Sequence, residues 1–285
     1  MSLHPAIKPG RTAVVTGGAS GIGLAAAKRL AALGMNIVIA DANEAALEEA
    51  RAALAGPAAR IEAMRVDVAQ ASQVEALRAR ALEAFGGDIA ILMNNAGLGG
   101  GGGAIENAEG WRRVIETNLF GVLNGVQAFA PGMMAAGRPS AIVNTGSKQG
   151  ITAPPGDTAY NVSKAGVKAL TEGLQHTLRN TPGCQVTAHL LVPGFTFTGM
   201  TRRRIAEKPP AAWTPEQVVD FALERMGDGD FYVICPDNEV TREVDNARMT
   251  WAMRDITQNR PPLSRWHPDY ADAFARFLAE ETGRG

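Results

Sequence analysis

The sequence predicts one α/β domain built on a doubly wound parallel sheet of about seven strands, with helices on both faces. Short runs rich in β-branched residues alternate with helical stretches along most of the 285 residues. Several of these runs are apolar throughout, as strands buried on both faces are. No linker or internal repeat divides the chain. Such strand–helix–strand alternation produces right-handed crossovers between parallel strands.

Seven segments have the composition and length of strands. They are Thr12–Val15, Asn36–Asp41, Arg60–Val66, Ile89–Asn94, Ser140–Thr145, Gln185–Val192 and Phe231–Ile234. The stretches between them predict helices over residues 22–33, 43–54, 72–85, 111–136, 157–180 and 214–226. Asn43 is placed to cap the second helix, which carries Glu44, Glu48 and Glu49 near its start, where the helix dipole favours acids.

Composition and charge exclude several classes of function. Hydrophobic residues make up 46% and charged residues 20%, the balance of an ordinary folded domain. A net charge of -1 provides no overall attraction to nucleic acid or to an anionic membrane, and no apolar run approaches the roughly 20 residues of a spanning helix. Cys184, Cys235 and the four histidines show no metal-ligand spacing. We therefore expect no metal site and a reducing, cytoplasmic location.

Two segments depart from the alternating pattern. Gly99–Gly103 is a run of five glycines, for which we expect a flexible loop. Residues 236–285 form a C-terminal extension in which Pro261 and Pro262 separate two helical stretches with apolar faces. The faces are Val240, Val244, Ala247 and Trp251, and then Tyr270, Phe274, Phe277 and Leu278. Two readings stay open: the extension packs on its own domain, or it closes over a substrate pocket.

A glycine-rich turn follows the first predicted strand. It reads Thr16-Gly17-Gly18-Ala19-Ser20-Gly21-Ile22-Gly23 and leads directly into a helix. Glycines there let the backbone approach a pyrophosphate, which binds the free N–H groups of the helix N-terminus. Asp41 ends the second strand 18 residues after Gly23, where an acid binds ribose hydroxyls and repels a 2′-phosphate. With uncharged Ser20 and Ala42 beside it, Asp41 predicts NAD as cofactor, unless it only caps the next helix.

Three further motifs follow later strands. They are Asn94-Asn95-Ala96-Gly97 after the fourth strand, Ser147 after the fifth, and Tyr160-x-x-x-Lys164 on the next helix. Together with the turn, whose Gly-x-x-x-Gly-x-Gly spacing is looser than the standard dinucleotide fingerprint, they closely resemble the NAD-dependent branch of the short-chain dehydrogenase/reductase family. The resemblance extends from about Thr12 to Thr198, roughly two thirds of the chain. It implies a Rossmann-type sheet.

The resemblance also implies roles for individual residues. Catalytic roles fall to Asn118, Ser147, Tyr160 and Lys164. Cofactor contacts are implied for Gly17, Ser20, Gly21, Ile22, Gly23, Asp41, Asp67, Val68, Asn94, Ala96, Gly97, Tyr160, Lys164, Pro193, Gly194 and Thr198. Family members pair through helices that correspond to residues 111–136 and 157–180, which implies a homodimer or homotetramer. The second helix carries a face of apolar and small residues: Val162, Gly166, Val167, Leu170 and Leu174.

Elementary chemistry supports the catalytic roles. Tyr160 and Lys164 are four residues apart on a helix and so project from one face. An ammonium about 4 Å from the phenol, at an effective dielectric near 20, is worth roughly 4 kcal/mol, which would lower the phenol pKa by about three units. Ser147 is expected to hold the substrate oxygen, and Asn118 resembles the family residue that anchors a water in a proton relay to Lys164. Each residue alone is more often structural, but four together favour chemistry.

These features predict NAD-linked oxidation of a secondary alcohol, or reduction of the ketone. Phe195, Phe197 and Met200 follow Pro193-Gly194 and favour a hydrophobic or aromatic substrate. The run Arg202–Arg204 is either a solvated charged segment or a contact for an anionic substrate group. Two alternatives remain: a non-catalytic NAD-sensing or scaffolding protein on the same fold, and imine reduction or epimerisation by the same residues.

Overall fold

The core of the computed structural model is a seven-stranded parallel sheet with the order β3-β2-β1-β4-β5-β6-β7. The structure describes residues 2–54, 60–199, 205 and 207–283. The strands are β1 (Thr12–Thr16), β2 (Asn36–Asp41), β3 (Ile61–Arg65), β4 (Ile89–Asn94), β5 (Ser140–Thr145), β6 (Val186–Val192) and β7 (Tyr232–Ile234). All seven predicted strands are therefore confirmed, with bounds that differ by one residue at most.

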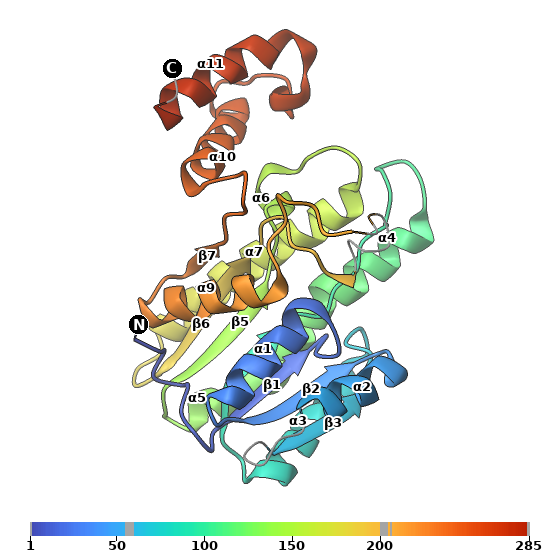
Figure 1. Cartoon of the computed structure of the whole chain (residues 1–285), viewed down its shortest axis with the longest axis vertical. Helices are drawn as coiled ribbons and strands as arrows, with labels where there is room; N and C mark the ends of the chain where they lie inside the picture. Colours follow the sequence, from blue (N-terminus) through green and yellow to red (C-terminus); the bar gives the residue numbers. More distant parts are fainter. Residues whose placement is uncertain (1, 55–59, 200–204, 206, 284–285) are drawn as a thin grey trace.

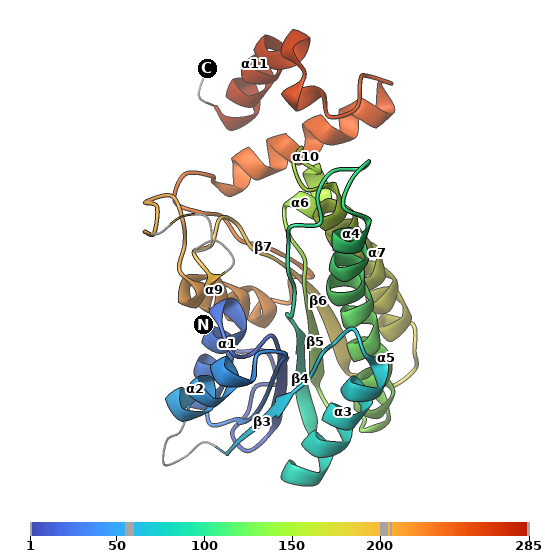
Figure 2. The same ribbon diagram turned by 90° about the vertical axis from the view of Figure 1, so that its right-hand side faces the viewer.

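Helices cover both faces of the sheet, as predicted (Figures 1 and 2). One face is covered by α1 (Gly21–Ala32), α2 (Glu44–Leu54) and α9 (Pro215–Gly227), and the other by α3 (Ala71–Phe85), α5 (Gly121–Ala135) and α7 (Thr158–Arg179). Asn43 caps α2 as predicted, since its Oδ1 accepts the Ala46 N–H at 3.1 Å. The helix predicted over 111–136 is composite: α4 (Ala108–Ile115) and α5 are joined by the π-helix η1 (Glu116–Phe120).

The strand order reverses between β1 and β4. The chain leaves β1 toward one face of the sheet and leaves β4 toward the other, so the loops diverge at the carboxyl edge between these strands. In open parallel sheets this switch point is where ligands bind. The glycine turn follows β1, the Asn94–Gly97 motif follows β4, and Ser147 follows β5 beside the short helix α6 (Gln149–Thr152), which sequence analysis did not predict.

The C-terminal extension contains α10 (Arg242–Thr257), two 3-10 turns, η2 (Ser264–Trp266) and η3 (Pro268–Tyr270), and α11 (Ala271–Thr282). Its helices pack on each other around Trp251 and Phe277. The Trp251 indole donates to Ser264 Oγ at 2.8 Å, and the Arg260 guanidinium lies 4.1 Å from the centre of the Trp251 ring. The extension contacts the sheet domain at α6 (Figure 2). The interpretation as one domain with an extension stays a prediction.

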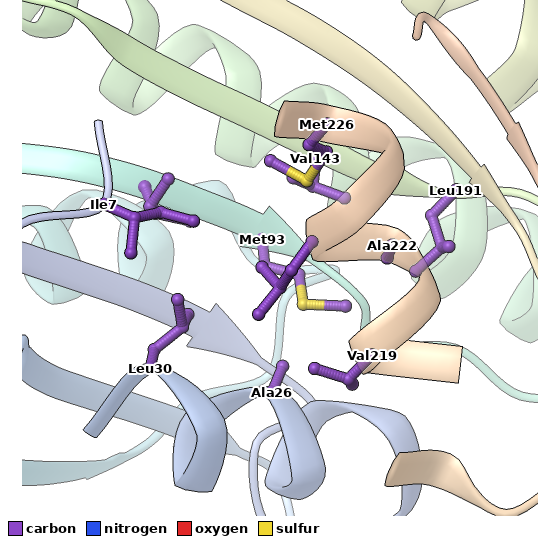
Figure 3. A pocket seen from close by; sticks show the side chains of 11 residues that line it. Ile7, Ala26, Leu30, Met93, Val143, Leu191, Val219, Ala222 and Met226 are labelled. Carbon is purple, nitrogen blue, oxygen red and sulfur yellow. The ribbon is translucent and has the colours of Figure 1, made fainter. Parts of the chain in front are cut away.

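A small cavity lies in the core between α1, α9 and the sheet (Figure 3). Its volume is about 30 Å³, and apolar side chains such as Leu30, Met93 and Met226 line it, so it is a void in the core. Within the described ranges, no helix is long and apolar enough to cross a membrane, and no group of acidic, histidine or cysteine side chains is arranged to hold a metal ion. Cys184 and Cys235 are free thiols.

Candidate active site

The glycine turn after β1 is closed by contacts that leave no room for side chains. Gly17 and Gly21 have φ angles of 62° and 52°, the left-handed region that favours glycine. A Cβ on Gly23 would lie 2.2 Å from the Gly17 carbonyl oxygen. The Asn95 side chain donates to the carbonyls of Thr16 and Gly17 at 3.2 and 3.3 Å. Asn95 therefore holds the turn in shape, a role that sequence analysis did not assign.

The N-terminus of α1 fits an anionic group. Ser20 is the N-cap residue, but its side chain makes no capping hydrogen bond, so the first N–H groups of α1 keep their donor capacity for a ligand. Thr198 lies opposite, with its Cβ 3.3 Å from where a Cβ on Gly21 would be. The turn and the loop after β6 thus form a glycine-lined cradle at a helix N-terminus, which fits the pyrophosphate of a dinucleotide. Ile22 and Gly23 lie in the first turn of this helix.

Asp41 faces the glycine turn from the end of β2. Its Oδ2 accepts the Ala19 N–H at 3.2 Å and its Oδ1 accepts the Asn43 N–H at 3.0 Å. Asn43, not Asp41, supplies the side-chain cap of α2, so capping that helix does not account for the acid. Each carboxylate oxygen has two lone pairs, which leaves acceptor capacity for ribose hydroxyls. The carboxylate is half-buried beside the place where the cradle would hold an adenosine ribose.

Three other residues predicted to contact the cofactor, Asp67, Val68 and Asn94, differ in how exposed their side chains are. Asp67 is exposed and accepts the Ala69 N–H at 3.0 Å, while Val68 is buried against Gly121. Asn94 is buried, donates to Asn144 Oδ1 at 2.8 Å and packs against Gly125. Its side chain is therefore committed to the interior, and only its backbone is available to a cofactor.

Gly97 opens the space between the cradle and the catalytic helix. A Cβ at this position would lie 3.3 Å from Asn118 Oδ1 and 3.5 Å from Lys164 Nζ, so any side chain would crowd both groups. Ala96, the preceding residue, lies against the turn, since its Cα would be 2.8 Å from a Cβ on Gly17. The motif after β4 therefore connects the glycine turn directly to two of the predicted catalytic residues.

Asn118 lies fully buried in the π-helix η1. Its Oδ1 accepts the Leu98 N–H and its Nδ2 donates to the Leu98 carbonyl, both at 2.8 Å, and Nδ2 also donates to Ser163 Oγ at 3.0 Å. The side chain thus joins the segment after β4 to α7. Single π-turns are frequent at functional sites because they re-aim backbone groups.

Ser147 and Tyr160 are brought together as predicted, close enough for the Ser147 hydroxyl to lower the pKa of the phenol. Asp157 caps α7 through Oδ1, which accepts the Tyr160 N–H at 3.2 Å. Its Oδ2 accepts the Gly100 N–H at 2.7 Å, which ties the glycine run to the start of the catalytic helix. The Trp111 indole donates to the Gly103 carbonyl at 2.7 Å. Hydrogen bonds therefore tie the Gly99–Gly103 loop at Gly100 and Gly103, while its expected flexibility stays a prediction.

The pKa of Tyr160 corrects a second expectation. Burial raises the pKa of the phenol above its ordinary value, the hydrogen bond from Ser147 lowers it, and the charge of Asp157 raises it. Lys164 Nζ lies 5.7 Å from the centre of the Tyr160 ring and donates to the Thr145 carbonyl at 2.7 Å. Desolvation of the phenolate is the largest effect on the Tyr160 pKa, so the prediction of a lowered pKa is wrong for this structure.

Lys164 is itself strongly perturbed. Its side chain is only 4% exposed, and burial lowers its pKa from 10.5 to about 8. The ammonium is the charged form that desolvation penalises, and the single carbonyl contact to Thr145 offsets this only in part. Perturbed lysine and tyrosine side chains on one helix face, beside a glycine-lined cradle, are typical of a site for proton transfer.

The loop after β6 contacts the first residues of the extension. A Cβ on Gly194 would lie 2.7 Å from the Pro236 carbonyl oxygen, and the Phe195 N–H donates to Asp237 Oδ2 at 3.3 Å. Pro193 and Phe195 are half-buried, whereas Phe197 is 9% exposed and belongs to the core. Met200 and Arg202–Arg204 lie outside the described residues. Of the three side chains expected to favour a hydrophobic substrate, only Phe195 is therefore placed at a partly open position.

Comparisons with known proteins agree with this geometry. A family model described as short chain dehydrogenase matches residues 11–209. The 1-deoxy-11-beta-hydroxypentalenate dehydrogenase of Streptomyces exfoliatus is 32% identical over 262 residues, which cover 90% of this chain and 94% of the relative.

Two solved structures resemble this one and differ in the cofactor that they contain. A short chain dehydrogenase/reductase from Burkholderia phymatum in complex with NAD is 34% identical, with a TM-score of 0.80 over 90% of this chain and 97% of that one. A metagenomic short-chain oxidoreductase in complex with NADP is 28% identical, with a TM-score of 0.66 over 80% of this chain and 97% of that one.

Proposed function

The chain belongs to the short-chain dehydrogenase/reductase family, and from that premise we propose that it uses NAD to oxidise a hydrophobic secondary alcohol or to reduce the corresponding ketone. Hydride-transferring oxidoreductase activity on CH–OH donors follows from the family and from relatives that are hydroxyl dehydrogenases. The choice of NAD, the roles of single residues and the class of substrate are proposals. The observation that carries them is the Ser147 hydroxyl next to the Tyr160 phenol, with buried Lys164 on the same helix as Tyr160.

Each of the four catalytic residues has a distinct task in this proposal. Tyr160 takes the proton from the alcohol hydroxyl during oxidation and returns it to the carbonyl oxygen during reduction. The Ser147 hydroxyl holds the substrate oxygen next to the phenol. Below about pH 8, which is its own pKa, the Lys164 ammonium is held on the Thr145 carbonyl and supplies positive charge on the same helix face as the phenol. Asn118 positions the segment after β4 against α7. The nicotinamide ring of the bound cofactor accepts or supplies the hydride.

The cofactor preference is tested together with the activity. Purified enzyme is expected to turn over members of a panel of secondary alcohols and ketones, followed by NADH absorbance, with kcat/KM for NAD about tenfold or more above that for NADP. A 2′-phosphate would lie beside the half-buried carboxylate of Asp41, and the two negative charges repel. Asp41→Asn should reduce the preference by improving the use of NADP, whereas Glu44→Gln, which removes a nearby exposed charge, should not. Equal use of both cofactors by the wild type would contradict the assignment to Asp41.

We also propose that the chain forms a homodimer or homotetramer through α5, η1 and α7. On the predicted face of α7, Val167 is buried in the protein's own core and Gly166 packs against Leu119. Val162, on the same helix, remains 45% exposed. Phe120 is also 48% exposed. Light scattering at micromolar concentration should give a mass of at least two 30.0 kDa chains. A monomeric mass would contradict this proposal.

A further inference from the structure

A second cavity lies between the C-terminal extension and the segment that follows Ser147. Its volume is about 300 Å³, which is within the range of pockets that hold small organic molecules. Residues of α6 and its flanks form one wall, and residues of α10 and η2 form the other. No motif of the sequence predicted this pocket, because its two walls come from segments about 100 residues apart.

The pocket carries more positive than negative charge. Lys148, Arg248 and Arg265 line it, and Asp245 is the one acid among the lining residues. Lys148 is already paired, since its Nζ lies 2.6 Å from Asp245 Oδ2 and 3.8 Å from Asp237 Oδ2. Even with Asp237 included, three cations face two carboxylates. The surplus of positive charge therefore lies on the two guanidinium groups.

Neither guanidinium group has an ion-pair partner in the described part of the chain. Arg248 Nε is buried and has no hydrogen-bond partner among the described groups. Burial, and then the charge of Arg248, lower the pKa of Arg265, and the charge of Asp245 raises it, with a net lowering to about 10. Both arginine side chains are partly buried, and Arg265 also lies 4.8 Å from the centre of the Trp266 ring. Partly buried like charges that lie near each other cost free energy, which an anion that accepts their hydrogen bonds would offset.

The remainder of the lining indicates what kind of anion fits. Ile151, Pro154, Ile234, Met249 and Trp266 give the pocket a largely apolar wall, which suits a carbon chain or ring attached to the anionic group. Planar guanidinium groups match the geometry of a carboxylate and bind it through paired hydrogen bonds. An organic carboxylate therefore satisfies both parts of the lining.

The pocket adjoins the catalytic residues through one short stretch of chain. Lys148 directly follows Ser147, and the Gln149 N–H donates to Ser147 Oγ at 3.2 Å, while both Lys148 and Gln149 line the pocket. A molecule in the pocket therefore lies against the backbone that presents the Ser147 hydroxyl. The extension supplies both unpaired arginines, which gives these residues a function beyond packing.

We propose that Arg248 and Arg265 bind the carboxylate of the substrate, so that the enzyme acts on a hydroxy acid or an oxo acid with an apolar chain. This inference rests on the proposed function and adds the class of substrate. It also assigns the C-terminal extension to substrate recognition rather than to stability alone.

Kinetics with matched substrates test the inference. We would compare hydroxyhexanoates, with the hydroxyl at each position from C2 to C5, with their methyl esters. For the preferred isomer, kcat/KM for the acid should exceed that for the ester by about tenfold or more, because the ester cannot form charge-assisted bonds. Arg248→Met and Arg265→Met should each raise KM for the acid by a similar factor while kcat changes little, as expected for loss of uniform binding.

The control is Arg276→Met, an exposed arginine on α11 that should leave all these constants unchanged. Kinetics of the ester should also be the same in all variants. Equal kcat/KM for acid and ester in the wild type, or an unchanged KM for the acid in both pocket variants, would overturn the inference.

Direct binding separates the pocket from the chemistry. Hexanoate carries no oxidisable hydroxyl, so calorimetric titration with hexanoate reports the pocket alone. Hexanoate should bind the wild type and the Arg276→Met control with similar affinity, and it should bind Arg248→Met about tenfold more weakly. Hexanamide should bind none of these proteins measurably. Hexanoate binding without turnover of any alcohol would refute the proposed function and keep the anion site. Turnover of neutral alcohols without hexanoate binding would refute the anion site alone.

Discussion

Replacing Tyr160 by phenylalanine is expected to lower kcat by about a thousandfold or more while leaving NADH binding nearly unchanged. The substitution removes only the hydroxyl group, which is the group proposed to exchange a proton with the substrate. The ring keeps its place on α7, where Asp157 caps the helix and Gly101 packs against Ala159. Loss of turnover with retained NADH binding, measured by single-turnover kinetics and fluorescence titration, would assign the proton transfer to this hydroxyl.

Tyr232→Phe is the matched control, because the Tyr232 hydroxyl donates to Glu172 Oε1 at 2.5 Å on the surface of the protein. This variant should retain wild-type kinetics. The pH profile gives a second test. Because burial raises the pKa of Tyr160, kcat/KM for alcohol oxidation by the wild type should increase with pH above neutrality. A Tyr160→Phe enzyme with wild-type activity, or a wild-type oxidation profile that falls over this range, would refute the mechanism.

The elements of the sheet domain were predictable because their signals are local. A continuous apolar run such as Ile89–Asn94 marks a strand buried on both faces, and Asn43 before Glu44 marks a helix start. The grouping of Ser147 with Tyr160 was predictable because parallel strands bring their carboxyl ends to one edge of the sheet. These inferences need only the spacing of residue types along the chain.

The errors concern quantities that depend on distant parts of the chain. The pKa of Tyr160 is set by how completely its surroundings exclude water, which spacing on one helix does not reveal. The composition of the glycine run predicts a flexible loop but does not reveal that Asp157, 57 residues away, accepts a hydrogen bond from the Gly100 N–H. The role of Asn95 likewise depends on the carbonyls of Thr16 and Gly17, nearly 80 residues earlier.

The extension was predictable as two amphipathic helices, and one of the two readings had it close over a substrate pocket, but which side chains would line a pocket was not predictable. Val244, Ala247 and Trp251 are buried, in agreement with the spacing. Ala247 and Trp251 pack against the second stretch through Phe277, and neither of the two readings of the extension included this pairing. Sequence periodicity shows that a face is apolar, whereas its partner depends on the path of the chain through residues 258–270.

Lys164→Met is expected to reduce kcat by about a hundredfold or more and, at the same time, to change how stability depends on pH. Methionine fills a similar volume but carries no charge, so the phenolate of Tyr160 would lose the positive group on its own helix face. The size of the loss tests how far an ammonium 5.7 Å from the ring centre assists proton transfer.

The effect on stability follows from the lowered pKa. In the unfolded chain Lys164 keeps its proton up to its ordinary pKa of 10.5, whereas in the folded protein it loses the proton above about pH 8. Between these values the unfolded state binds more protons, so the folded state gains stability as pH rises. Below pH 8 both states are charged, and the cost of burying the ammonium is present in full. The free energy of unfolding of the wild type should therefore rise relative to that of Lys164→Met by on the order of 2 kcal/mol between pH 7.5 and 9.5.

Urea denaturation of both proteins across this range measures the difference directly. Lys168→Met provides the control on the same helix, because Lys168 is partly exposed and pairs with Glu172 at 2.9 Å. Its stability should follow the wild type over the same pH range. If the curves for the wild type and Lys164→Met run parallel, Lys164 is not charged and desolvated in the folded protein, and its electrostatic role in the proposed mechanism fails with it. If they diverge as expected, the lysine proposed to assist Tyr160 is one that the fold retains at a cost to its own stability.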